Sequence, residues 1–113
     1  MNLKEIIEKL NLTVKCAENK LDNEITGGYA SDLLSDVIAN SQKGNIWITM
    51  QAHVNIVAVA VLKELSAIII VRGREPNEDT LKKAKEENIP IITSKLPTFQ
   101  LVGKLYGNGI GKT

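Results

Sequence analysis

Residues 67–71 read Ala67-Ile68-Ile69-Ile70-Val71, a continuous apolar run in which every residue after the first is β-branched. Such a run is typical of a strand whose two faces are both covered, which is the usual setting of parallel strands. We therefore predict that it is the central strand of a sheet lying between two layers of helices. The remaining elements can be assigned outward from it.

The segments on either side of this run repeat a strand–helix pattern. Before it, residues 45–50 are strand-like and lead into a helix from about Val54 to Leu65. After it, a charged helix at 78–88 precedes a strand at 89–93. Strands that alternate with helices of about ten residues imply right-handed crossovers. The predicted fold is a three-layer α/β/α sandwich with a largely parallel or mixed sheet.

The two ends of the chain complete this pattern. A helix is predicted at 3–10, a strand at 12–16, a short extended piece at 25–30, a helix that Ser31 or Asp32 can cap, and a last helix that begins at Pro97. One domain at 1–106 accounts for all of these elements. Residues 107–113 are rich in glycine, and we expect them to form a flexible C-terminal tail.

Composition excludes several function classes. Fourteen basic and 13 acidic side chains in 113 residues leave a net charge of +1, which gives no strong attraction for nucleic acid or an anionic membrane. Cys16 is the single cysteine, so an internal disulfide and a cysteine-rich metal site are excluded. The apolar stretch at 54–62 is about half as long as the roughly 20 residues of a membrane span. We expect a cytoplasmic protein with neither a nucleic-acid nor a membrane partner.

The best candidate site is a set of glycines and polar residues at predicted strand ends. Its members are Gly27, Gly28, Thr49, Gln51, His53, Asn55, Arg72, Arg74, Thr93 and Ser94. If the strands are parallel, these loops emerge at one edge of the sheet, where arginines and helix N-termini suit a phosphate or carboxylate. Arg72 and Arg74 fit equally well as solvated side chains or as side chains that pair with Glu75 between subunits.

His53 is the sole histidine and lies between a predicted strand end and a helix start, where α/β sheets gather ligands. A ligand contact and a local helix-capping role are both open. With no second histidine or thiol nearby in the sequence, we predict neither a metal site nor a cofactor. Asp32 and Asp36, which are four residues apart, are interpreted as solvent-facing acids near a helix N-terminus.

The helix at 54–62 carries apolar side chains around most of its circumference. A helix that lies on a sheet needs only one apolar stripe. We therefore predict a homodimer interface through Val54, Val57 and Val61. The alternative is that the flanking helices cover this surface.

Two stretches carry a resemblance to a known family: Thr26-Gly27-Gly28-Tyr29-Ala30-Ser31-Asp32-Leu33-Leu34-Ser35-Asp36-Val37 and Gly44-Asn45-Ile46-Trp47-Ile48-Thr49. Together with residues 51–58 and 72–76 they resemble the DRTGG domain in its stand-alone form, over about 25–105. Glu24 and Ile25 stand in place of the Asp and Arg that name the motif. The resemblance implies a regulatory domain similar to the N-terminal domains of HPr kinase and of the MurE and MurF ligases, and it makes nucleotide binding conceivable.

Kinase activity is the least favoured hypothesis. Gly111-Lys112-Thr113 looks like the end of a phosphate-binding loop, but that motif needs a glycine where Tyr106 stands. The leading hypothesis is a non-catalytic regulatory homodimer that senses a small anionic metabolite or nucleotide, or docks a partner protein. The alternatives are a structural interaction domain without a ligand and an enzyme related to serine kinases.

Overall fold

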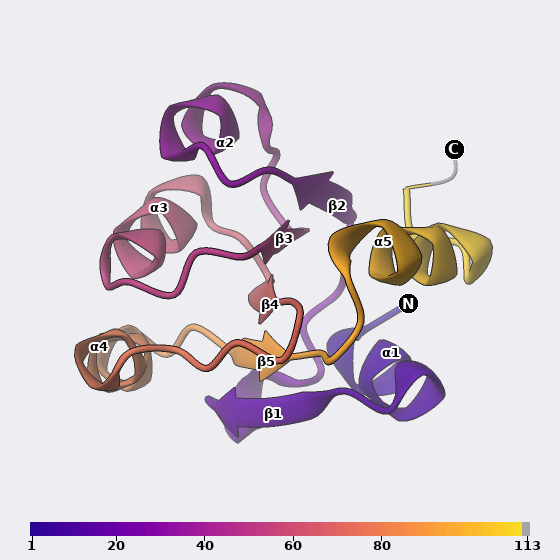
Figure 1. Cartoon of the computed structure of the whole chain (residues 1–113), viewed down its shortest axis with the longest axis horizontal. Coiled ribbons are helices and arrows are strands. Elements are labelled where there is room, and N and C mark those ends of the chain that lie inside the picture. The colour runs from indigo at the N-terminus through magenta and orange to yellow at the C-terminus, as the bar shows by residue number, and fades with distance from the viewer. Residues whose placement is uncertain (112–113) are drawn as a thin grey trace.

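A computed structural model describes residues 1–111. In it the apolar run at 67–71 forms β4 (Ala67–Ile70), the middle strand of a five-stranded sheet. All four residues of β4 are buried, because helices cover both faces of the sheet (Figure 1). The prediction of a central strand covered on two sides is confirmed.

The other strands are β1 (Thr13–Cys16), β2 (Gly27–Ala30), β3 (Asn45–Thr49) and β5 (Ile91–Thr93). The helices are α1 (Leu3–Leu10), α2 (Leu34–Asn40), α3 (Asn55–Lys63), α4 (Glu78–Glu87) and α5 (Thr98–Gly107), with a 3-10 turn η1 (Glu18–Lys20). The strand order is β1-β5-β4-β3-β2; β2 to β5 are parallel, and β1 is antiparallel to β5. The predicted α/β/α sandwich with a mixed sheet is confirmed.

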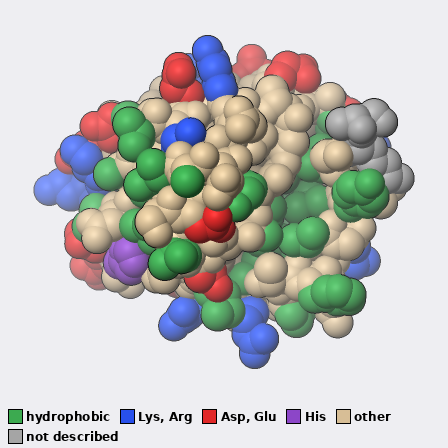
Figure 2. Space-filling model, turned by 90° about the horizontal axis from the view of Figure 1, so that it is seen from above, with side chains coloured by type: hydrophobic (Ala, Val, Ile, Leu, Met, Phe, Trp, Pro, Cys, Tyr) green, Lys and Arg blue, Asp and Glu red, His purple; other side chains and the backbone are tan. Residues whose placement is uncertain are grey.

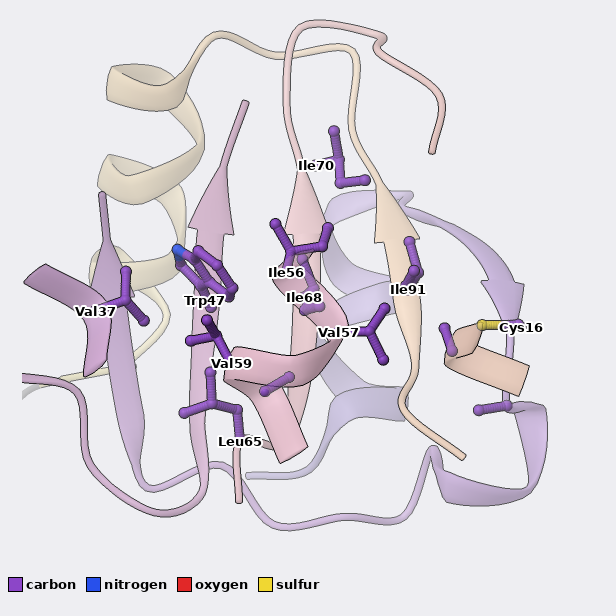
Figure 3. Close-up of a cluster of buried hydrophobic side chains, with 13 residues drawn as sticks. Cys16, Val37, Trp47, Ile56, Val57, Val59, Leu65, Ile68, Ile70 and Ile91 are labelled. Atoms are coloured by element: carbon purple, nitrogen blue, oxygen red, sulfur yellow. The ribbon is translucent and has the colours of Figure 1, made fainter. Parts of the chain in front are cut away.

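Two cores lie on the two faces of the sheet, because successive residues of a strand point to opposite sides. On one face Trp47 and Ile68 pack with Ile56 of α3, in the layer formed by α2, α3 and α4 (Figure 3). On the other face Ile48 and Ile69 belong to the core that α1 and α5 cover, as Figure 1 shows. Each helix therefore needs only one buried stripe, except α3.

Helix α3 buries more of its surface than one stripe, because α2 and α4 pack against its two sides. Val57 is fully buried in the chain's own core, so its assignment to a subunit interface is wrong. Val54 is half-buried, and Val61 is 40% exposed. The neighbouring helices thus cover most of the apolar surface that the sequence shows, and Val61 and Leu62 stay outside.

The C-terminal boundary of the packed chain lies later than predicted. Gly107 is the last residue of α5, and Ile110 is 7% exposed and packs into the core beside Gly28. Gly109, with a φ of +101°, turns the chain back for this contact. Packing of the chain therefore extends to Ile110, past the domain boundary predicted at 106. The flexibility of the tail stays a prediction, and residues 112–113 lie outside the described residues.

Cys16 ends β1 with its thiol in the core. The thiol donates a hydrogen bond to the carbonyl oxygen of Ile89 at 3.3 Å, and burial raises the pKa of Cys16. A raised pKa keeps the thiol protonated and unreactive. Among the described helices, none combines the length and hydropathy that a membrane crossing requires.

Candidate functional site

The carboxyl ends of β3, β4 and β5 lie side by side. The register pairs Thr49 with Ile70 and Ile70 with Thr93, so the loops that follow these strands leave the sheet at one edge. We call this edge, with the loops at 50–54, 71–77 and 94–97, the carboxyl rim. The predicted site residues lie on it, except for Gly27, Gly28 and Asn55, and Asn55 is the first residue of α3.

Gly27 and Gly28 lie at the opposite edge, which corrects the predicted composite site. They begin β2, and Gly27 is paired with Asn45, the first residue of β3. Thr49 is four residues further along β3, about 13 Å away at the usual rise of a strand. The error arises because a glycine pair beside a strand does not reveal which end of the strand it occupies. At Gly27 the backbone instead comes close to the Asn45 side chain, because a Cβ at this position would lie 3.2 Å from the side-chain Nδ2 atom of Asn45.

Asp32 takes the place on the rim that the glycines do not fill. Its carboxylate accepts hydrogen bonds from the Thr49 hydroxyl at 2.8 Å and from the Met50 amide at 2.7 Å. Gln51 donates through its side chain to the carbonyl oxygen of Asp32 at 3.0 Å. Asp32 is therefore neither a helix cap nor a free acid; the N-cap of α2 is Leu33, without a side-chain bond. It fixes the start of the loop after β3.

Contacts between neighbouring loops hold the rest of the rim. Arg74 donates to the carbonyl oxygen of Met50 at 3.0 Å, and Thr80 donates to that of Ala52 at 2.7 Å. Within the described residues of one chain, Glu75 forms an ion pair with Lys15 at 2.6 Å. Arg72 is exposed and has a φ of +61°, a left-handed conformation. Arg74 thus has a structural contact, whereas Arg72 faces solvent.

His53 stands out among the rim residues. Its Nδ1 atom is buried and has no hydrogen-bond partner within residues 1–111. Val54 precedes α3, and the helix has no side-chain cap bond, so the His53 side chain does not cap it. The backbone carbonyl oxygen of His53 does accept a hydrogen bond from the Ile56 amide at 3.3 Å. An unpaired buried polar atom costs about 1–3 kcal/mol, which makes this position an exception.

A cavity of about 560 Å³ opens on the rim between β1, β5, α1 and α5. We call it the lysine pocket, because its lining includes Lys9, Lys15, Lys95 and Lys104. Glu75 is the single acid in the lining, so the charged side chains sum to +3. Thr93 and Ser94 also line it and are the two predicted site residues that do.

Two further hollows differ in character. One of about 210 Å³ lies between β2 and α5 and is mostly apolar, with Ile48, Leu105 and Ile110 in its lining. Figure 2 views the molecule from the side of α2 and β2, and hydrophobic side chains are prominent there. The other, of about 410 Å³, lies at the amino edge of the sheet beside Lys43 and Glu64. Neither contains the predicted polar residues of the rim.

Beside β2, Tyr29 donates a hydrogen bond to the carboxylate of Asp36 at 2.8 Å, and Asn40 donates to the same oxygen at 2.8 Å. The bond from Tyr29 is the main reason why the pKa of Asp36 is lowered. The same bond raises the pKa of Tyr29. Asp36 is thus a satisfied structural carboxylate. Across residues 1–111, no three His, Cys, Asp or Glu side chains are grouped as metal ligands would be.

Comparison with known proteins gives two results. The sequence model of the DRTGG domain family matches residues 5–107. A similar solved structure is that of the CBS and DRTGG domains of the regulatory region of Clostridium perfringens pyrophosphatase, in complex with its activator diadenosine tetraphosphate. The TM-score is 0.74 at 20% identity, over 90% of this chain and 44% of that one. The present chain therefore spans less than half of that structure, and the likeness shows the shared fold.

Proposed function

The chain belongs to the DRTGG domain family, and on this premise we propose that it is a non-catalytic regulatory domain that binds a nucleotide or another small anionic ligand at its carboxyl rim. The observation that carries the proposal is the lysine pocket, a concave site of net charge +3 at the edge where α/β folds bind ligands. The pyrophosphatase region that shares the fold was solved with a nucleotide activator. The resemblance of the present chain to the N-terminal domains of HPr kinase and of the MurE and MurF ligases stays a prediction.

A non-catalytic role is supported by how the reactive groups on the rim are used. A general base or nucleophile needs a partner within hydrogen-bond reach. The Asp32 carboxylate already binds Thr49 and Met50, and the buried nitrogen of His53 has no partner in residues 1–111. Tyr106 stands where a phosphate-binding loop needs glycine, and Lys112 and Thr113 lie outside the described residues. We expect no phosphate transfer from labelled ATP to a serine peptide.

The proposal includes a homodimer. Exposed apolar side chains lie on the adjacent helices α2 and α3 and at the N-cap of α2: Leu33, Ile38, Val61 and Leu62. Leu33 and Leu62 are about two-thirds exposed, at 64% and 65%. Apolar surface of this kind marks contact sites. The same surface supports the second candidate, an interaction domain that binds a partner protein without any ligand.

Light scattering tests the dimer. We expect a dimer at micromolar concentration, and we expect Leu62→Glu to give a monomer because a charge in an apolar interface is costly to desolvate. Lys63→Glu, on the same helix, is the matched control. A monomeric wild-type chain would contradict this part of the proposal. The single buried cysteine fits a reducing compartment, and we place the protein in the cytoplasm on that basis.

A thermal shift panel of nucleotides and anionic metabolites tests the ligand. A ligand that binds only the folded chain, at a hundred times its Kd, stabilises it by about 2.7 kcal/mol and raises the Tm. We expect at least one phosphorylated compound to do so. If no compound raises the Tm, the interaction domain without a ligand is the better description.

A further inference from the structure

The lysine pocket gathers positive charge from both ends of the chain. Lys9 lies in the last turn of α1 and Lys15 in β1, whereas Lys95 and Lys104 come from the loop after β5 and from α5. These segments meet because β1 runs antiparallel beside β5, with Thr13 opposite Thr93. Like charges around one hollow repel each other unless an anion lies between them.

The chain supplies only a small part of the countercharge. Glu75 forms an ion pair with Lys15 at 2.6 Å, and the side chain of Lys15 is 28% exposed. Within residues 1–111 no ion pair involves Lys9, Lys95 or Lys104. Three ammonium groups therefore line the cavity without an acidic partner. Glu75 occupies the fourth, and it would compete with an added anion for Lys15.

The rest of the lining indicates which part of a ligand fits. The volume of about 560 Å³ is in the range of pockets for small molecules. No aromatic side chain lines it, and its apolar side chains are Leu10 and Leu96. Stacking on aromatic side chains is the usual means of holding a nucleobase. The hydroxyl groups of Thr13 and Thr93 are instead suited to donate to phosphate oxygens.

From this lining we infer that the lysine pocket binds clustered phosphate groups, so that phosphates and not a nucleobase determine the affinity of the ligand. The inference rests on the proposed function and names the ligand chemistry of the same rim. A multiply charged phosphate compound replaces the missing countercharge for Lys9, Lys95 and Lys104. Inorganic polyphosphate and the phosphate chain of a nucleotide share this chemistry, and the experiment below separates them.

The test is calorimetric titration of the full chain, at low salt, with tripolyphosphate, ATP and adenosine. We expect tripolyphosphate and ATP to bind with similar affinity, and adenosine not to bind. Lys95→Ala and Lys104→Ala should each weaken binding by about fivefold, the upper range for exposed ion pairs. Glu75→Gln should strengthen it by about twofold to fivefold, because it removes the competing carboxylate.

Lys82→Ala is the matched control, since this exposed lysine lies on α4, outside the pocket, and its loss changes the net charge equally. Thermal unfolding without ligand checks that each variant folds. Equal weakening by Lys82→Ala would overturn the inference, because it would show attraction by net charge alone. If ATP binds far more tightly than tripolyphosphate, or adenosine matches ATP, a base-binding site elsewhere is indicated.

The two proposals fail in different ways. Suppose that ATP or another panel compound binds the wild type, and that the Lys95→Ala and Lys104→Ala variants bind it equally well. Then the inference that the lysine pocket binds the phosphates is contradicted, and the proposed regulatory function stands. If the wild-type chain binds neither tripolyphosphate nor any compound of the panel, both proposals are contradicted. A gain for Glu75→Gln together with losses for the two lysine variants supports both.

Discussion

The edge of the sheet at the amino ends of the parallel strands, called the amino edge, and the carboxyl rim use their polar groups differently. At the amino edge, the Ser66 hydroxyl lies 2.7 Å from the carbonyl oxygen of Glu24 and 2.9 Å from that of Gly44. Thr26 donates to the carbonyl oxygen of Lys43 at 2.7 Å and accepts from Asn45 at 3.2 Å. At the carboxyl rim, by contrast, three of the four lysines that line a cavity have no acidic partner within residues 1–111. The chain satisfies the hydrogen bonds of the amino edge by itself, whereas the lysines of the carboxyl rim are suited to an anion from outside the chain.

The size of a hollow does not explain this difference. The amino edge also has one, of about 410 Å³, against about 560 Å³ for the lysine pocket. Its charged lining is Lys43, Glu24 and Glu64, with Lys43 and Glu64 paired at 3.7 Å, so it sums to −1. If the lysine pocket is the binding site that we propose, charge and pairing, more than volume, distinguish it from the depression at the other end of the strands.

The largest predicted effect is at Gly44, which holds the closed amino edge. Its φ is +83°, and a Cβ would lie 2.6 Å from the Thr26 Cγ2 atom. Gly44→Ala should lower the free energy of unfolding by about 3 kcal/mol, measured by urea denaturation, because strain and a clash add. Gly73→Ala on the rim should cost about 1 kcal/mol, since its φ is +69° but nothing lies within 4 Å. Equal losses would contradict the contrast between the edges.

Asp32→Ala should have the next largest effect, because Asp32 is the one rim acid that holds both Thr49 and Met50. We expect the free energy of unfolding to fall by about 1–2 kcal/mol, less than the roughly 3 kcal/mol that two bonds to a charged group can give, because Asp32 is exposed to solvent. Asp22→Ala is the matched control, since Asp22 is exposed and its side chain has no bond within the described residues. A loss equal to that of the control would contradict the claim that the Asp32 bonds stabilise the start of the loop after β3.

His53→Leu tests whether His53 or the lysine pocket alone provides the ligand contacts on the carboxyl rim. Because the buried Nδ1 has no bond to lose and its unpaired burial costs about 1–3 kcal/mol, the free energy of unfolding should not fall and should rise by up to that amount. The Tm increase caused by a phosphorylated ligand should persist, since His53 is not in the lining of the lysine pocket. If the protein stays stable but the ligand-induced increase disappears, His53 is a ligand contact and the pocket is not the whole site.

The smallest predicted effect concerns Tyr29 and Asp36, whose side chains hydrogen-bond to each other without any group from outside the chain. The lowered pKa of Asp36 stabilises the fold above the ordinary carboxyl pKa, and this contribution is lost as the pH falls through the lowered value. Tyr29→Phe should move the pKa of Asp36 up toward its ordinary range, followed by NMR titration. Asn40→Ala should move it less, since the Tyr29 bond is the larger cause. An unchanged pKa in Tyr29→Phe would show that the bond does not form in solution.

The layers and most elements were predictable because they depend on local patterns. The apolar run at 67–71 and the helical periodicities before and after it determine the alternation of strands and helices. The direction of β1 and its place beside β5 were not predictable, because pairing of distant strands leaves no local pattern. Ile110 was missed for a related reason, since one apolar residue among glycines gives no periodicity.

The site was predictable only where strand direction alone decides it. Thr49, Arg72 and Thr93 follow or end parallel strands, and they lie on one rim as expected. Gly27 begins a strand, so the same rule places it at the other edge. The lysine pocket was missed because its charges come from four elements and depend on the β1–β5 pairing. Asp32 had one available signal, its position just after β2 and beside the end of β3.

The pairing of Thr13 with Thr93 joins the first strand made to the last, across nearly the whole length of the chain. Such non-local contacts form late, because much chain entropy must be lost before they can close. The walls of the lysine pocket therefore come together only after β5 and α5 have been made. An anion held there would stabilise chains in which β1 has paired with β5 and leave chains without this pairing unaffected, so that binding would also report on the formation of this strand pair.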